Sequence, residues 1–518
     1  MRPFLAAIAL VAVACIPTLG DDAADVAAPT PVSDARAGGT IRVEVPALDT
    51  VDPGDAADPA ARLVVRTACE QLISFDPATG EPRPALAESW TIAAGGRKLF
   101  VRLRDDARFS DGSPVTARDV TFTLSRVASQ AFASRAANLV QPVAGYEEIH
   151  GDVETRSARM REELAGARAA DTRTVEIELK EPRADFFLVL GHPALTPVSQ
   201  RVVEADPDAF ARRPICAGPY RFAAPFERDE AVRLVRNDGY EGINTAYTRG
   251  GAGWADEIVF GSTGPFDVAR ARTGSVTAPG ARIEFVGLPT SIPPFDDPAV
   301  RRALSLALDR DRIAEVRGSS EPATGFLAQD CDAVRTDVGA ARALIADAGL
   351  DRTTFAFNDE FGNGAVVREV ARQWRRALGL RVELEPMRWE EFLGAGRSTA
   401  GFDAPFRWSW EPAVPSPEHA LVPLFDDSGI GADNVSRFDS LTFADALDEA
   451  RRTVEDDERA EKWRAVEQVL CDQMPMIPLT VDERAFRLGD RVASATGRVL
   501  SVPSAEPILR ELYIVHFD

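Results

Sequence analysis

The clearest pattern of hydrophobic and polar positions in the chain lies between residues 86 and 127. Apolar and polar side chains alternate from Leu99 to Leu103, which predicts a half-buried strand. Asp111–Pro114 has the composition of a turn, because its glycine tolerates positive φ and its proline cannot continue a strand ladder. Thr116 and Asp119 then have the spacing of a capping box at the start of a helix. The apolar face predicted for that helix consists of Val120, Leu124 and Val127.

Patterns in the second half of the chain predict helices that alternate with strands. Asp297 can cap a helix and Pro298 suits its first turn. The apolar stripe of that helix consists of Val300, Leu304, Ala307 and Leu308. Helices are also expected over 338–348 and 366–378, each ending at a glycine and each followed by an alternating strand. This order predicts parallel strands in a mixed α/β lobe.

Four further elements follow from shorter patterns. Strands are expected around 41–45 and 175–179, where apolar side chains alternate, and a short helical piece is expected at 67–72. A last long helix is expected over about 457–472. The side chains that it is predicted to bury are Trp463, Val466 and Leu470.

The N-terminus has the pattern of an export signal. Arg2 precedes an apolar run, Phe4–Ala14, that is too short to span a bilayer and ends at Cys15. Ala12–Cys15 resembles a bacterial lipobox, whose cysteine is lipidated, so we expect residues 1–15 to be a signal peptide with a lipid attachment site at Cys15. The alternative is plain signal-peptidase cleavage and free secretion. Residues 16–37, rich in Ala, Asp and Pro, are expected to form a disordered tether.

Cysteine usage agrees with an extracytoplasmic location. Lipidation of Cys15 leaves an even set of four cysteines, which suits an oxidising compartment, whereas plain cleavage leaves five. The four are Cys69, Cys216, Cys331 and Cys471. They allow three pairings, and the sequence does not select one.

Charge and motifs exclude several classes of function. A net charge of −22 argues against binding nucleic acid or an anionic membrane through a basic patch. The chain has no Gly-x-Ser-x-Gly elbow, no phosphate-binding loop and no His-Glu-x-x-His pair. Its four histidines are scattered and are interpreted as surface or packing residues: His150, His192, His419 and His516. We therefore expect no catalytic activity, no cofactor and no metal site.

An aromatic and charged segment is the best candidate for ligand binding. Arg407–Glu411 places two tryptophans beside an arginine, and Trp389 follows another arginine. Indole faces and guanidinium donors suit an organic ligand with apolar bulk and a carboxylate. The candidate ligand-binding residues are Arg407, Trp408, Trp410, Glu411 and Trp389. Alternation puts Trp408 and Trp410 on one face of a strand, and a Trp-rich core strand is the alternative interpretation.

Several of these strings resemble one protein family. Leu86–Trp90 (LAESW), Phe109–Pro114 (FSDGSP) and Ala117–Val120 (ARDV) follow one another as in the signature segment of the extracytoplasmic solute-binding proteins of ABC importers, the peptide/nickel-binding family 5. Gly38–Thr40 resembles the family's opening and Pro294–Pro298 another of its segments. The resemblance covers nearly all of residues 38–518.

The resemblance implies an α/β fold of two lobes joined by hinge crossovers, the large type II fold of periplasmic binding proteins with an extra subdomain. The first lobe is expected to comprise residues 38–265 and 480–518, with an inserted subdomain at about 72–172. The second lobe is expected to comprise residues 266–479.

The resemblance also implies a function. The protein is expected to capture a peptide or peptide-like solute between its lobes and deliver it to an ABC permease and ATPase, as a monomer anchored by lipid to the outer face of the bacterial cell membrane or in the periplasm. Binding of a metal chelate or an oligosaccharide is an alternative within the family. A sensory descendant without a transport role and a secreted hydrolase with an unrecognised site are further alternatives.

Two departures from the family pattern bear on the cargo. Peptide binders of the family carry Arg-x-x-Trp-x-x-Asp, in which the aspartate binds the terminal amine of the peptide; Arg407 and Trp410 match, but Ala413 stands in place of the aspartate. The stretch between Ile258 and Pro294 is also shorter than is usual in the family. The resemblance therefore implies membership of the family more directly than it implies peptide binding.

Overall fold

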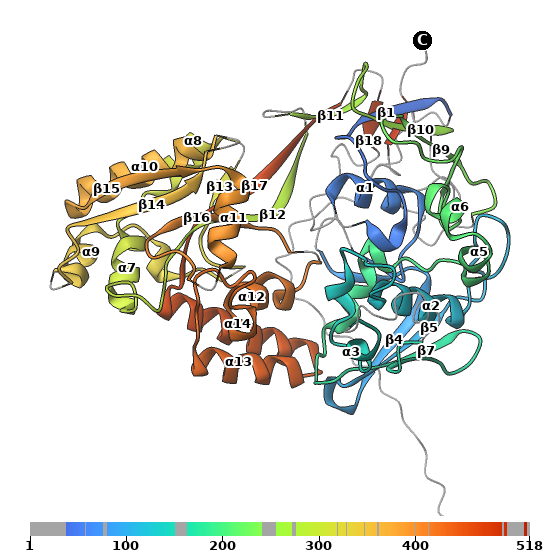
Figure 1. The fold of residues 1–518 in the computed structure, drawn as a ribbon, viewed down its shortest axis with the longest axis horizontal. Coiled ribbons are helices and arrows are strands. Elements are labelled where there is room, and N and C mark those ends of the chain that lie inside the picture. The colour runs from blue at the N-terminus through green and yellow to red at the C-terminus, as the bar shows by residue number, and fades with distance from the viewer. Residues whose placement is uncertain are drawn as a thin grey trace, which may run out of the picture.

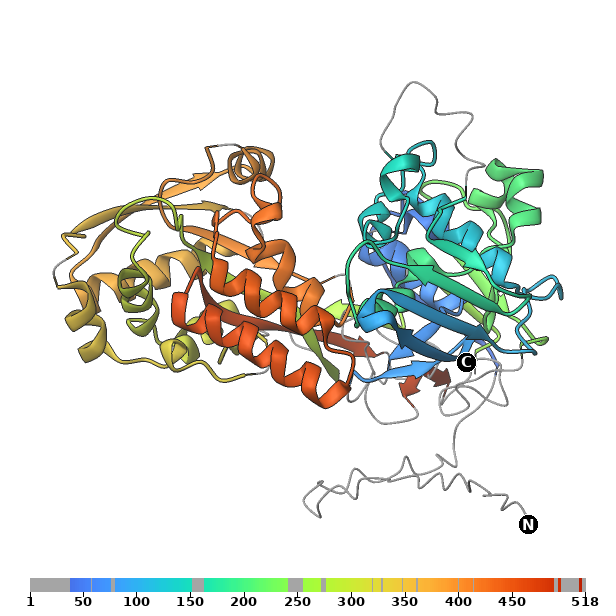
Figure 2. The ribbon, with the colours of Figure 1, turned by 90° about the horizontal axis from the view of Figure 1, so that it is seen from below.

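A computed structural model of the chain has two lobes that form separate masses in perpendicular views (Figures 1 and 2). We call β1 to β11 with their helices the first lobe and β12 to β17 with their helices the second lobe. The residues that the structure describes are 38–56, 58–75, 80–150, 163–240, 255–271, 276–318, 320–327, 329–346, 348–359, 362–398, 400–412, 414–488, 492–494 and 512–514.

The first lobe combines short strands with short helices. Its strands are β1 (Thr40–Glu44), β2 (Ile73–Phe75), β3 (Pro82–Pro84), β4 (Ala87–Ala93), β5 (Lys98–Leu103), β6 (Ala167–Ala169), β7 (Thr174–Glu178), β8 (Tyr220–Phe222), β9 (Val232–Arg236), β10 (Glu257–Gly261) and β11 (Val268–Ala271). Its helices are α1 (Pro59–Ala68), α2 (Ala117–Ala128), α3 (Tyr146–His150), α5 (Gln200–Ala205) and α6 (Pro207–Arg212).

The second lobe holds the longest described helices. Its strands are β12 (Val276–Gly287), β13 (Ser320–Pro322), β14 (Arg352–Asn358), β15 (Arg381–Met387), β16 (Phe406–Trp410) and β17 (Met476–Leu488). Its helices are α7 (Pro298–Leu306), α8 (Arg310–Arg317), α9 (Val338–Ile345), α10 (Asn363–Leu378), α11 (Trp389–Arg397), α12 (Pro417–Phe425), α13 (Leu441–Arg452) and α14 (Asp456–Gln473). Two short strands follow, β18 (Val492–Ser494) and β19 (Leu512–Ile514).

The strand, turn and capped helix predicted between residues 86 and 127 are confirmed. Alternate residues of β5 are buried, and β5 lies inside an antiparallel sheet of order β4-β5-β7-β6. The hydroxyl of Thr116 accepts from the Asp119 amide, and the Asp119 carboxylate accepts from the Thr116 amide, so the capping box forms at the start of α2. This sheet and helix share one core, which draws its buried residues from Leu72 to Ala217 and also includes Val414.

The mixed α/β character predicted for the second lobe is also confirmed. Asp297 caps α7 by accepting from the Ala299 amide, and Gly379 ends α10 in the left-handed conformation at φ 74°. β14 and β15 pair in parallel through the crossover helix α10. The core of this lobe draws its buried residues from Phe285 to Leu479.

One helix expectation is wrong. The helical piece expected at 67–72 is the end of α1, which begins eight residues earlier, at Pro59, where Asp58 caps it through the Ala61 amide. Cys69 already has extended backbone, and residues 73–75 form β2. An aspartate followed by proline at the first helical position was the signal for the true start.

The two lobes are joined by paired strands. The largest sheet has the order β15-β14-β16-β12-β17-β11-β1-β10-β9-β8, with β13 also paired to β17. β12 and β17 are antiparallel neighbours over most of their length, and they bridge the two masses in Figure 1. Further along the chain, β17 pairs with β11, so the last long strand enters the first lobe. Two crossover segments therefore form one ribbon between the lobes.

Candidate functional site

The apolar face of β16 belongs to the core of the second lobe. Trp408 is opposite Phe285 of β12, is 6 % exposed, and its ring contacts those of Phe392 and Phe406 at centroid distances of 5.5 and 6.4 Å. Trp410 shares this face, is partly buried, and donates from its indole nitrogen to the carbonyl of His419 at 3.1 Å.

The other face of β16 carries buried charge. Nε of Arg407 donates to Oε1 of Glu284 at 2.7 Å, and both side chains are buried. Nε of Arg317, at the end of α8, lies 3.2 Å from Oε2 of the same Glu284. Two guanidinium groups thus surround one carboxylate that is 0 % exposed.

This polar region continues toward the end of β16. Nη2 of Arg282 donates to Oε2 of Glu411 at 3.2 Å, and Nε of Arg282 lies 4.0 Å from Oδ2 of Asp482 on β17. Burial raises the pKa of Asp482, and the nearby arginines oppose that rise. We call the six side chains together the charged face: Arg282, Glu284, Arg317, Arg407, Glu411 and Asp482.

The structure therefore separates the residues predicted to bind ligand. Arg407 and Glu411 lie in the charged face, whereas Trp408 lies in the core. Trp389 is 44 % exposed and is the first residue of α11, after the end of β15. Arg282, Glu284 and Asp482 were not predicted, because they come from strands distant in sequence.

The topology places several strand ends at the same edges. β14, β15 and β16 run parallel and lead into α10, α11 and the segment before α12, and β1 and β10 are parallel neighbours in the first lobe. In open α/β sheets, ligands bind outside the carboxyl ends of parallel strands. Figure 1 shows α11 in the second lobe, next to β16 and β12, and α1 in the first lobe; both helices follow such strand ends.

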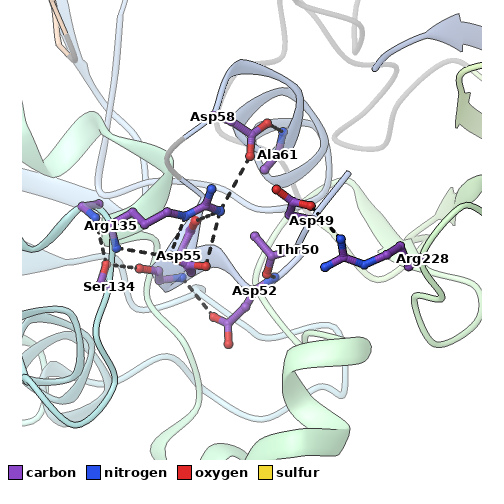
Figure 3. Close-up of polar contacts among 11 residues, drawn as sticks. Asp49, Thr50, Asp52, Asp55, Asp58, Ala61, Ser134, Arg135 and Arg228 are labelled. Atoms are coloured by element: carbon purple, nitrogen blue, oxygen red, sulfur yellow. Dashed lines mark hydrogen bonds and ion pairs between the residues drawn. The ribbon is translucent and has the colours of Figure 1, made fainter. Parts of the chain in front are cut away.

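The segment after β1 is held by aspartates at every third position (Figure 3). Asp55 accepts from Nε of Arg135 at 3.1 Å, and Asp49 accepts from Nη1 of Arg228 at 3.1 Å. The carboxylate of Asp52 accepts from both terminal nitrogens of the buried Arg126, at 2.8 and 2.6 Å. The regular spacing of these aspartates is visible in the sequence.

The lobes also meet directly at a point away from the crossover strands. Arg183 of the first lobe pairs with Glu418 of α12, and Arg451 of α13 donates to the same carboxylate at 2.7 Å. The hydroxyl of Ser416 donates to Asp185 at 2.8 Å. A cavity of about 690 Å³ lies at this contact, lined by residues of both lobes.

Burial shifts the ionisation of the groups at this contact. Burial, with repulsion from Glu418, raises the pKa of Asp185 to about 6. Burial also lowers the pKa of His419 to about 4. The imidazole of His192 is buried in the first lobe, and its pKa is likewise lowered.

The structure pairs the four cysteines within lobes. Cys69 is bonded to Cys216 in the first lobe, and Cys331 is bonded to Cys471 in the second. Cys15 and Ala413 lie outside the described residues.

The described residues include neither a cluster of metal-ligating side chains nor a membrane-spanning helix. No group of three or more His, Cys, Asp and Glu side chains among them could hold a metal ion. Within the described part of the chain, no helix has the length and apolar character needed to cross a membrane.

Comparison with known proteins identifies a family and several relatives. The family model described as bacterial extracellular solute-binding proteins, family 5, middle, matches residues 81–432. The "Probable deoxycholate-binding periplasmic protein YgiS" of Escherichia coli K12 is 27 % identical and covers 83 % of this chain and 85 % of its own. The "Glutathione-binding protein GsiB" of Escherichia coli O157:H7 is 24 % identical and covers 84 % and 87 %.

Solved structures share the fold. The murein tripeptide binding protein MppA in its unliganded open form has a TM-score of 0.76 and 20 % identity, covering 93 % of this chain and 98 % of its own. OppA of Haemophilus influenzae in complex with the peptide RPPGFSPFR has a TM-score of 0.65 and 20 % identity, covering 92 % and 99 %. The two-lobed α/β fold is thus shared over nearly the full length of both chains.

Proposed function

The chain belongs to the bacterial extracellular solute-binding proteins of family 5, the substrate-binding components of ABC importers, and from this premise we propose that it captures a peptide or peptide-like solute between its lobes. One observation carries the proposal: two lobes, each with neighbouring parallel strands, are joined by the paired strands β12 and β17. Such a connection allows the lobes to close around a solute.

Closure couples binding to recognition by the importer. A solute that contacts both lobes has a higher affinity for the closed state, so its binding shifts the population toward closure. The permease and ATPase subunits then take up the solute, and the chain itself acts by binding rather than by catalysis. The lobes correspond to residues 38–265 with 480–518 and to residues 266–479 in this proposal.

The proposed ligand-binding residues differ in how they act. Trp389, exposed at the start of α11, and Trp410, at the end of β16, offer indole surface to the solute. Glu411 and Arg407 contribute polar groups through the charged face. Trp408 supports them from the core.

The location of the protein follows from its family and its N-terminus. Members of the family are extracellular, and relatives are named as periplasmic. We propose that the mature chain is anchored through a lipid on Cys15 and acts as a monomer. Mass spectrometry of the mature N-terminus from membranes tests the lipid directly.

Isothermal titration calorimetry with the purified chain tests the function. Di- to pentapeptides, glutathione, a metal chelate, an oligosaccharide and deoxycholate are titrated separately; deoxycholate is included because one relative is named for it. Binding of a peptide at micromolar concentration supports the proposal. If deoxycholate is the only probe that binds, the proposed solute is an amphipathic acid rather than a peptide. If no probe binds at millimolar concentration, an import role is contradicted.

A further inference from the structure

Asp482 has the fewest partners of the three carboxylates in the charged face. Glu284 is paired with two arginines, and Glu411 accepts a hydrogen bond from Arg282. Asp482 lies 4.0 Å from Arg282, and within the described part of the chain its carboxylate accepts no hydrogen bond. Its side chain is 16 % exposed, so it is largely desolvated yet still reachable.

Asp482 also lies where β17 passes from one lobe to the other. Residues Ser320–Pro322 pair with 480–482 of β17, whereas β11 pairs with 485–488. Opposite Asp482 the register of β12 shifts between Pro279 and Ile283, which is a bulge in the crossover ribbon. Bulges redirect side chains and occur next to functional sites. A solute enclosed by closing lobes would meet this ribbon.

Polar atoms around Asp482 lack partners. The hydroxyl oxygens of Thr480 and Ser320 are buried and have no hydrogen-bond partner among the described residues. Oε2 of Glu284 is also buried and accepts no hydrogen bond there, although it forms an ion pair with Arg317. The strand register puts Thr480 opposite Glu284 and Ser320 opposite Asp482, on the same face. Buried polar atoms in native proteins usually have partners, so this face is suited to a polar group from outside the chain.

The contacts of Asp482 and the alanine at position 413 both bear on which side chain meets a positively charged group of the solute. A peptide binder of the family would meet the terminal amine with the aspartate that Ala413 replaces. We infer that Asp482 receives the positively charged group of the solute, an ammonium or a guanidinium, and that the protein binds a cationic or zwitterionic organic molecule. This inference rests on the proposed function, because it places the group in the solute between the lobes.

Asp482 would attract the cationic group of the solute through a charge-assisted hydrogen bond in a partly desolvated site. Such bonds are roughly twice as strong as neutral ones. Burial raises the pKa of Asp482, so a cation brought next to it stabilises the ionised carboxylate. Arg282 donates its hydrogen bond to Glu411 and meets Asp482 only as an ion pair at 4.0 Å, so the carboxylate of Asp482 keeps its hydrogen-bond acceptors for the solute.

Titration calorimetry of the full mature chain with matched probes tests the inference. The probes are trialanine and N-acetyl-trialanine, which differ in the ammonium group, together with glutathione and deoxycholate. We expect Asp482→Asn to weaken binding of the amine-bearing probes by about tenfold or more, the loss of one charged hydrogen bond. Binding of N-acetyl-trialanine stays within about twofold of the parent. The matched control is Glu321→Gln, an exposed carboxylate on the neighbouring strand β13, which leaves all affinities unchanged.

Each other outcome decides against the inference. Equal affinity of parent and Asp482→Asn for every amine-bearing probe overturns it, as does an equal loss for the acetylated probe. Binding of deoxycholate alone by the parent overturns it while the solute-binding role stands. No binding of any probe counts against the proposed function as well. Melting temperatures are measured in parallel, and Asp482→Ser serves as a second neutral variant if the first is unstable.

Discussion

Nε of Arg407 donates a hydrogen bond of 2.7 Å to Oε1 of Glu284, and the two side chains are 6 % and 1 % exposed. The pair joins β16 to β12 on the face opposite Trp408. Removing one partner from a buried ion pair leaves a charge without compensation, which costs several kcal/mol.

Arg407→Met is therefore expected to lower the free energy of unfolding by about 3 kcal/mol. Glu284 keeps its ion pair with Arg317 in this variant, so adding Glu284→Gln should deepen the loss, because the buried Arg317 then loses its carboxylate as well. Urea denaturation followed by tryptophan fluorescence measures both variants. Arg381→Ala, which breaks an exposed pair with Asp351, is the control and should change stability by less than about 1 kcal/mol. Equal effects at the two pairs would contradict the buried geometry.

Trp408 and Trp389 should respond oppositely to truncation. Trp408→Ala removes a core side chain and is expected to cost about 3 kcal/mol or more of stability. Trp389→Ala, at a position that is 44 % exposed, should cost less than about 1 kcal/mol and should instead weaken solute binding. Thermal unfolding and calorimetric titration separate the two effects. A large loss of stability from Trp389→Ala would show that its ring is a packing element.

Asp185 and His419, at the lobe contact, should have opposite effects on how stability changes between pH 4 and 6.5. The pKa of Asp185 is raised to about 6, above its unfolded value, so the native state binds the proton more tightly and this contribution to stability falls as pH rises through that window. The pKa of His419 is lowered to about 4, so the unfolded state binds more protons and this contribution rises with pH. Each amounts to about 3 kcal/mol across the window.

Asp185→Asn is therefore expected to show stability that rises more steeply with pH than the parent, and His419→Asn the reverse. Glu418, whose pKa is lowered by Arg183 and Arg451 despite burial, stays ionised in this range. The lowered pKa of His192 adds a rising slope common to all variants. Melting temperatures recorded from pH 4 to 7 measure the slopes, with the exposed Asp208→Asn as control. Identical slopes in parent and variants would exclude the buried ionisation assigned here.

The two disulfides should stabilise the lobes separately. Cys69–Cys216 and Cys331–Cys471 close loops with sequence separations of 147 and 140 residues, for which the chain-entropy model gives about 5 kcal/mol each. Replacing either pair with serines should lower the melting temperature while the other lobe keeps its protection in hydrogen exchange. Loss of protection in both lobes from one double variant would show that the lobes unfold as one unit.

Local sequence signals were sufficient for much of the fold. Thr116 and Asp119 act over three residues, Asp297 precedes the helix it caps, and Gly379 ends a helix through its own backbone. Such signals depend on neighbouring residues alone, so they can be interpreted without the rest of the chain. The family signature between residues 86 and 127 is of this kind.

The candidate site could not be predicted in the same way. Glu284 is 123 residues from Arg407, and Asp185 is 231 residues from Ser416. Alternation along β16 identified which side chains share a face, but burial of Trp408 is set by α11 and β12, which the strand's own sequence does not encode. Cysteine pairing is equally non-local.

The path of β17 has a consequence for the order in which the chain matures. Val268 of β11 pairs with Leu488, so one neighbour of β11 in the sheet is synthesised only near the end of translation. A partly made chain therefore carries an open strand edge in the half that emerges first, and such edges recruit other strands. A truncated product that lacks β17 is therefore expected to aggregate rather than persist as a free first lobe.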